Sequence, residues 1–120
     1  MTLEDLKGRP GILYVAVPYD AHPHGLNSAA YDADRHAGHL IRLDFTVFSP
    51  ISHSHSMARA AGLDPRDYDL WMKQNAPFMD ACFAMVAVHI DGWRESIGMK
   101  MEREAFRSMG KPIVEMAALP

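Results

Sequence analysis

Four short apolar segments, with helix-like stretches between them, constrain the fold of this chain more than any other feature. The segment 83–90 (FAMVAVHI) is apolar on both faces, which is typical of a strand covered on both sides of a sheet. Three further segments lie close to Gly or Pro and have the apolar and β-branched character of strands: 12–17, 45–49 and 112–116. Strands that alternate with helices form a parallel sheet with helices on both faces.

We therefore predict one α/β domain over residues 1–120. It should be a three-layer, flavodoxin/Rossmann-like sandwich with a sheet of four or five mainly parallel strands. A first helix is expected at about 29–43, where Ser28 is placed to cap it. A last helix is expected at 96–110 and should end at Gly110.

The middle of the chain carries weaker helix signals. Residues 51–63 are expected to be a loop that passes into a short helix, which stops at Gly62. Residues 64–82 form a second helical region, which Pro77 should kink or divide because proline lacks a backbone N–H.

Composition excludes several classes of protein. Hydrophobic residues make up 48% of the 120 residues, enough for one core and too many for a disordered chain. A net charge of −3 argues against binding to a nucleic acid polymer. No apolar run approaches the length of a membrane span, the start of the chain is unlike a signal peptide, and Cys82 has no partner for an intrachain disulfide. We expect a cytoplasmic protein without a membrane partner.

The stretch 91–104 (DGWRESIGMKMERE) follows the third expected strand. In parallel sheets, ligands bind beyond the carboxyl ends of the strands. Ser96 lies near a helix start, where free N–H groups and partial positive charge favour an anion. Glu102 and Ser96 do not share a face of an ideal helix, but both face a cleft if the helix begins nearer residue 98. From spacing alone, the commoner outcome is a solvent-exposed Glu102 carboxylate paired with a nearby lysine or arginine side chain.

Three motifs, LYVAVPY (13–19), FSPISHSHS (48–56) and DGWRESIGMKMEREAFRSMGKP (91–112), resemble a group of short uncharacterised proteins in the nucleoside 2-deoxyribosyltransferase-like superfamily. The resemblance covers about residues 12–114. The superfamily also contains 2-deoxynucleoside 5-monophosphate N-glycosidases and cytidine monophosphate N-glycosidases. The resemblance implies an enzyme that cleaves the N-glycosidic bond of a small nucleotide or nucleoside, without a cofactor or metal, and that assembles as a homo-oligomer, a dimer or larger.

The resemblance also implies roles for single residues. The superfamily nucleophile lies four residues after a loop glycine, here Gly98, which makes it Glu102. Six residues before the nucleophile, the monophosphate glycosidases have a serine that binds the 5-phosphate and the transferases have an aspartate. The residue here is Ser96, which favours a 5-monophosphate. Tyr14 corresponds to a tyrosine that positions the nucleophile. Further substrate contacts are expected from the neighbouring strand-end segments: Tyr19, His53, His55, Asp91 and Trp93.

One position departs from the superfamily pattern. The acid that assists the leaving base falls on Asn75, and an amide can bind a base but cannot protonate it. A nucleotide-binding or sensing module that has lost turnover is therefore an alternative to an enzyme. Asp69 and Asp80 lie nearby in sequence.

Paired histidines give a third hypothesis. His22 and His24, and likewise His53 and His55, are two residues apart, and in extended chain such pairs share a face. Two pairs together would make a four-ligand metal site. The commoner interpretation is polar loop residues, some of which line a nucleotide pocket.

Overall fold

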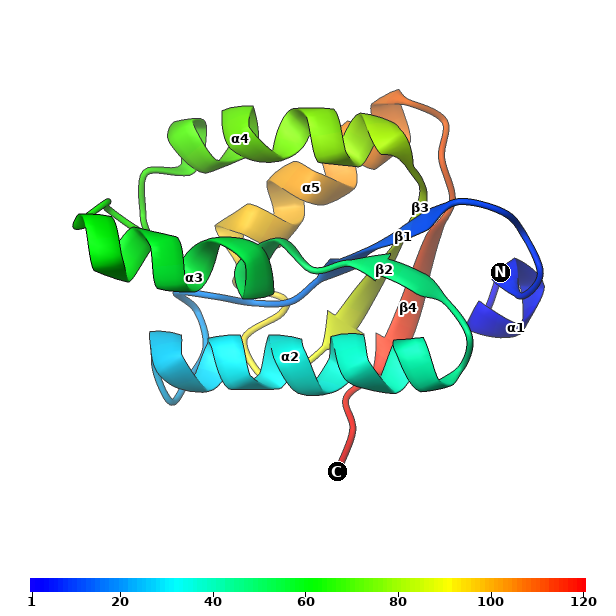
Figure 1. Ribbon diagram of the computed structural model, residues 1–120, viewed down its shortest axis with the longest axis horizontal. Coiled ribbons are helices and arrows are strands. Elements are labelled where there is room, and N and C mark those ends of the chain that lie inside the picture. The colour runs from blue at the N-terminus through cyan, green and yellow to red at the C-terminus, as the bar shows by residue number, and fades with distance from the viewer.

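A four-stranded parallel sheet forms the centre of the protein in the computed structural model, which describes residues 1–120 (Figure 1). The strands lie in the order β2-β1-β3-β4, and every neighbouring pair is parallel. Their bounds are β1 Ile12–Ala16, β2 Thr46–Phe48, β3 Cys82–His89 and β4 Ile113–Ala117. The helices are α1 Leu3–Leu6, α2 Leu26–Arg42, α3 Pro50–Ala61, α4 Tyr68–Ala81 and α5 Ile97–Ser108. This confirms the predicted single-domain α/β sandwich of flavodoxin/Rossmann-like type.

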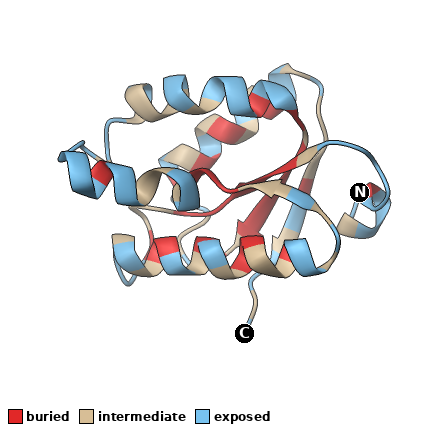
Figure 2. Cartoon of the chain, viewed as in Figure 1, coloured by how far each residue is buried: buried red, intermediate tan, exposed pale blue.

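Helices cover both faces of the sheet. Helix α2 lies on one face, and α4 and α5 lie on the other, while α3 follows β2 directly and packs beside α2 (Figure 1). The buried residues concentrate on the strands and on the helix sides that face them (Figure 2). None of the helices is both long and apolar enough to span a membrane.

Strand β1 contributes to two separate cores because its side chains alternate between the faces of the sheet. Leu13 and Val15 pack in the core on the α2 side. Tyr14 and Ala16 pack in the core that includes Phe106 of α5. The alternation therefore directs the Tyr14 side chain towards α5.

Three predicted helix starts are wrong. Helix α4 begins at Tyr68, four residues after the expected start of the helical region at 64–82. Helix α2 begins at Leu26 with Gly25 as its N-cap, three residues before the expected start after Ser28. Helix α3 begins at Pro50, immediately after β2, so the expected loop is helical from its first residue. Proline suits the first turn of a helix, because the N–H that it lacks would have no partner there. At its other end, α3 stops as predicted at Gly62, which adopts a left-handed conformation.

Pro77 does not divide helix α4. The helix runs unbroken from Tyr68 to Ala81, and the Asp67 side chain caps it by accepting a hydrogen bond from the Leu70 N–H. Lys73, whose carbonyl loses its partner four residues before the proline, is exposed, as Pro77 is. Water can therefore satisfy the free carbonyl, and the helix continues.

Gly92 allows the loop after β3 to pack tightly against the loop after β1. It has a φ of +99°, and a Cβ atom there would lie 2.3 Å from the carbonyl oxygen of Ala21. Both the conformation and the close contact require glycine. This contact brings together two of the strand-end segments that the sequence marks as functional.

Replacing Gly92 with Ala should destabilise the protein by at least about 2 kcal/mol, because the added methyl group meets backbone and the positive φ is strained. Urea unfolding of the parent and variant measures the effect. Gly38→Ala is the matched control: Gly38 lies within α2, and a Cβ there meets nothing within 4 Å. That variant should be neutral or more stable by up to about 1 kcal/mol. Equal unfolding midpoints for the two variants would contradict the role of Gly92.

Candidate functional site

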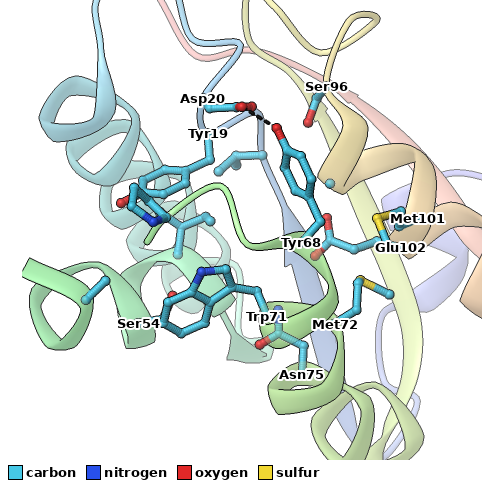
Figure 3. A pocket seen from close by; sticks show the side chains of 15 residues that line it. Tyr19, Asp20, Ser54, Tyr68, Trp71, Met72, Asn75, Ser96, Met101 and Glu102 are labelled. Atoms are coloured by element: carbon cyan, nitrogen blue, oxygen red, sulfur yellow. Dashed lines mark hydrogen bonds between the residues drawn. The ribbon is translucent and has the colours of Figure 1, made fainter. Parts of the chain in front are cut away.

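A pocket opens at the carboxyl end of β1, where the strand order reverses between β1 and β3 (Figure 3). Such a position is the usual ligand site of open parallel sheets. The pocket has a cavity volume of about 70 Å³. Its walls come from the β1–α2 loop, α3, α4 and the start of α5.

Glu102 is a buried carboxylate in the wall of this pocket. Its side chain comes from the second turn of α5, and the residue is only 7% exposed. The Tyr14 hydroxyl donates a hydrogen bond of 2.5 Å to Oε2 of Glu102. Tyr14 is itself fully buried, and its ring packs against Phe48 and Phe106. Packing thus fixes the donor, and the donor fixes the carboxylate.

Burial makes the Glu102 carboxyl group a weaker acid than an exposed one. Loss of hydration raises the pKa of its carboxyl group from 4.5 to about 7, although the hydrogen bond from Tyr14 acts in the opposite direction. Burial and the neighbouring Glu102 also raise the pKa of Tyr14 well above its ordinary value, so the phenol keeps its proton and donates it. A carboxyl group with a pKa near neutrality in a cleft is typical of functional sites.

Ser96 and Glu102 line the same pocket. Helix α5 begins at Ile97, and Ser96 is its N-cap, with extended backbone geometry. Because Ser96 lies outside the regular helix, it can reach the same cavity as Glu102 although the two positions would not share a face of an ideal helix. Its side-chain oxygen accepts a hydrogen bond of 3.1 Å from the Met99 N–H. Ser96 therefore caps the helix, and Gly98 beside it also reaches the pocket wall.

One stripe of helix α4 forms the opposite wall. The residues at positions i, i+3, i+4 and i+7 of this stripe are Tyr68, Trp71, Met72 and Asn75. The indole N–H of Trp71 donates to the carbonyl of Asp64 at 2.9 Å, which orients the ring at the pocket wall. Asp69 and Asp80 are exposed and do not line the pocket, so Asn75 is the polar side chain that α4 offers there beside the Tyr68 hydroxyl.

A second carboxylate lies in the pocket, at a position that was not among the sequence candidates. Asp20, from the loop after β1, lines the cavity, and its Oδ2 accepts a hydrogen bond from the Tyr68 hydroxyl. The Arg66 guanidinium lies 3.7 Å from the same oxygen. The available signal was that Asp20 lies in a strand-end segment, only one residue after the Tyr19 candidate.

Tyr19 and His55 lie at the edge of the pocket. Tyr19 lines it, and its hydroxyl lies 2.6 Å from Nδ1 of His55. Nε2 of His55 lies 3.0 Å from the side-chain oxygen of Asn27, so both ring nitrogens are already engaged. His55 borders a neighbouring shallow hollow that it shares with Tyr19.

The structure does not bring three other candidates into the pocket. Trp93 instead stacks on His89 at the end of β3, with ring centroids 3.8 Å apart. His53 is exposed and packs beside Phe78 on the outside of α3 and α4. Asp91 is exposed and borders a different hollow.

The metal-site hypothesis assumed that both histidine pairs lie in extended chain, and this is wrong for His53 and His55. His53 and His55 are helical, and two residues apart on a helix they point in different directions. His22 is buried and engaged, with Nε2 2.8 Å from Asp32 and Nδ1 accepting from the His24 N–H. The structure places no three His, Cys, Asp or Glu side chains together as potential metal ligands.

Residues 11–118 match a family model described as "Domain of unknown function (DUF1937)". The chain belongs to this family. A comparison with curated proteins finds no match for it. The DUF1937 match spans all four strands and every residue that lines the pocket, so the pocket is part of the family's folded unit.

Replacing Glu102 of this DUF1937 domain with Gln should stabilise the fold in a pH-dependent way. Below pH 4.5 the carboxyl group is neutral in both folded and unfolded states, and its contribution to stability is lost as the pH rises to about 7. At pH 8 the parent therefore holds a buried charge that the variant lacks. Glu102→Gln, which keeps an acceptor for Tyr14, should raise the free energy of unfolding by roughly 3 kcal/mol at pH 8.

Urea unfolding at pH 4 and pH 8 measures this effect, which should be small at pH 4. Glu104→Gln on the exposed side of the same helix is the control and should show no such pH dependence. Identical unfolding midpoints for the parent and Glu102→Gln at pH 8 would show that Glu102 is not a strained, buried acid.

Proposed function

We propose that this DUF1937 domain is an N-glycosidase or deoxyribosyltransferase that cleaves the N-glycosidic bond of a nucleotide or nucleoside. The observation that carries the proposal is the buried Glu102 carboxylate in the pocket wall, held by Tyr14. The resemblance of the three sequence motifs to the nucleoside 2-deoxyribosyltransferase-like superfamily supplies the reaction class. In that resemblance Glu102 is the nucleophile and Tyr14 its positioning residue.

The geometry around Glu102 suits nucleophilic attack on a sugar. Tyr14 occupies Oε2, whereas no protein group donates to Oε1, which is therefore free to attack the anomeric carbon. The bond from that carbon to the base breaks, and the electron pair leaves with the base. Water or a second base then displaces Glu102 from the glycosyl-enzyme intermediate, so that configuration is retained overall. A buried carboxylate also stabilises the oxocarbenium-like transition state.

The α4 stripe suits the base of the substrate. Trp71 and Met72 offer an aromatic and a polarisable surface for a planar ring, and the Asn75 amide can both donate to and accept from its edge. On the Glu102 helix, Ser96 and the first-turn N–H groups suit the opposite, sugar 5-end of the substrate. Considered by itself, Ser96 favours a 5-monophosphate there.

A second candidate function is nucleotide binding without turnover. Asn75 favours it, because this amide cannot deliver the proton that a departing base needs. In that case the same pocket binds the same class of ligand as a sensing module.

Base release tests the enzyme. The parent protein is incubated with a panel of ribo- and deoxyribonucleosides and their 5-monophosphates, and free base is measured by chromatography. We expect release from at least one compound, and a loss of roughly 10³-fold or more in Glu102→Gln, because the nucleophile is removed. Glu104→Gln, a neutralised carboxylate on the exposed side of α5, should retain parental activity. If no compound in the panel yields base, the protein is not an enzyme of this class.

Asn75→Asp separates the enzyme from the binding module. If the scaffold is otherwise catalytic, an acid at this position should accelerate base release by roughly 10²-fold, because it can protonate the departing base. Gln74→Glu adds a carboxylate to the neighbouring exposed position and should change nothing. Thermal stabilisation by a nucleotide, with no base release from either the parent or Asn75→Asp, would favour the module.

A further inference from the structure

The end of the pocket beside Ser96 already holds a negative charge. Figure 3 shows Asp20 and Ser96 at one end of the pocket, and Asn75 and Trp71 at the other. The tight contact between Gly92 and Ala21 holds the two loops that carry Asp20 and Ser96 side by side. The Asp20 side chain is only 19% exposed.

Tyr68 keeps this charge in place. Its hydroxyl donates to Asp20, and this hydrogen bond raises the pKa of Tyr68, so the phenol keeps its proton and remains the donor to this carboxylate. The proton of the Tyr68 hydroxyl is consequently committed to Asp20 and is not free for a ligand. The second oxygen of Asp20 remains able to accept a hydrogen bond.

No positive side chain balances this charge within the pocket. The lining residues include two carboxylates, Asp20 and Glu102, and no lysine, arginine or histidine. Arg66 pairs with Asp20 at 3.7 Å from outside the lining, but its side chain is 61% exposed, so water screens most of its effect on the pocket. A phosphate group carries up to two negative charges and is normally bound by cations as well as by helix N–H groups.

We propose that the pocket selects nucleosides with a free 5-hydroxyl, that Asp20 accepts a hydrogen bond from this hydroxyl, and that Asp20 excludes a 5-phosphate. The inference rests on the proposed function and narrows its substrate class. The proposed preference for a nucleoside is the opposite of the preference for a 5-monophosphate that Ser96 alone suggests. Ser96 already uses its side-chain oxygen to accept from Met99, so its hydroxyl can donate one hydrogen bond but does not offset a carboxylate next to it. Asp20 is thus the specificity-determining residue at this end.

Paired substrates provide the test. The kcat/KM for base release is measured for each nucleoside and for its 5-monophosphate. We expect the parent to prefer the nucleoside by at least about tenfold, because like charges in a partly buried site repel. Asp20→Asn removes the charge, keeps an acceptor for Tyr68 and frees Arg66, so the ratio should move at least about tenfold towards the monophosphate.

Two further variants isolate the role of charge. Tyr68→Phe retains the Asp20 carboxylate and should still prefer the nucleoside. Asp69→Asn removes a carboxylate from the exposed side of α4 and should leave the ratio as in the parent. A parent that prefers the monophosphate, or an unchanged ratio in Asp20→Asn, would overturn the inference while leaving the N-glycosidase proposal intact.

A binding measurement separates this inference from the proposed function. Thermal shift of Glu102→Gln is recorded with a nucleoside and with the matching monophosphate, so that neither is consumed. Larger stabilisation by the nucleoside supports the inference even if the parent releases no base from any compound. Equal or larger stabilisation by the monophosphate, or no stabilisation by either, overturns it.

Discussion

The hydrogen bond between Tyr14 and Glu102 joins the central sheet to helix α5 inside the core, and the organisation of the pocket depends on it. An ionised carboxylate at this depth loses hydration, and a single donor cannot replace all of it. The result is a carboxyl group whose pKa is about 7. Such a group favours function over stability, because a buried apolar side chain would be the more stabilising choice. Tyr14 is positioned by packing against the rings of Phe48 and Phe106, so ordinary core packing holds the donor that orients Glu102.

Backbone geometry, more than any side-chain network, assembles the rest of the site. Alternation along β1 directs Tyr14 to the α5 side and Leu13 to the α2 side. The parallel sheet brings the ends of β1 and β3 to the same edge, and Gly92 lets their loops touch. The helix start at Ile97 then places Ser96 and Glu102 on the same cavity although they are six residues apart. Each of these features is local, and together they produce a pocket lined by two carboxylates and by no lysine, arginine or histidine.

The sequence was informative where structure follows from local pattern. All four strands lie within one residue of their expected bounds, because apolar runs between turn residues leave few alternatives. The sequence predicted that Glu102 and Ser96 would face one cleft only if helix α5 began close to residue 98, and it begins at Ile97. The start of α3 at Pro50 was missed because a Ser- and His-rich segment has weak helix propensity, and packing of the helix against α2 outweighs it. Asp20 was missed for a different reason: its contact with Tyr68 spans 48 residues, and no periodicity encodes such a pair.

The stripe of helix α4 that forms one wall of the pocket has a consequence for how this site can diversify. The side chains of this stripe lie on α4, whereas the Glu102 carboxylate lies on α5 and its hydrogen-bond partner Tyr14 lies on β1. Exchanges along the stripe change the shape and polarity of one pocket wall without moving the Glu102 carboxylate on the other. The chemical character of this wall can therefore vary along a single helix face while the buried Glu102–Tyr14 pair stays in place.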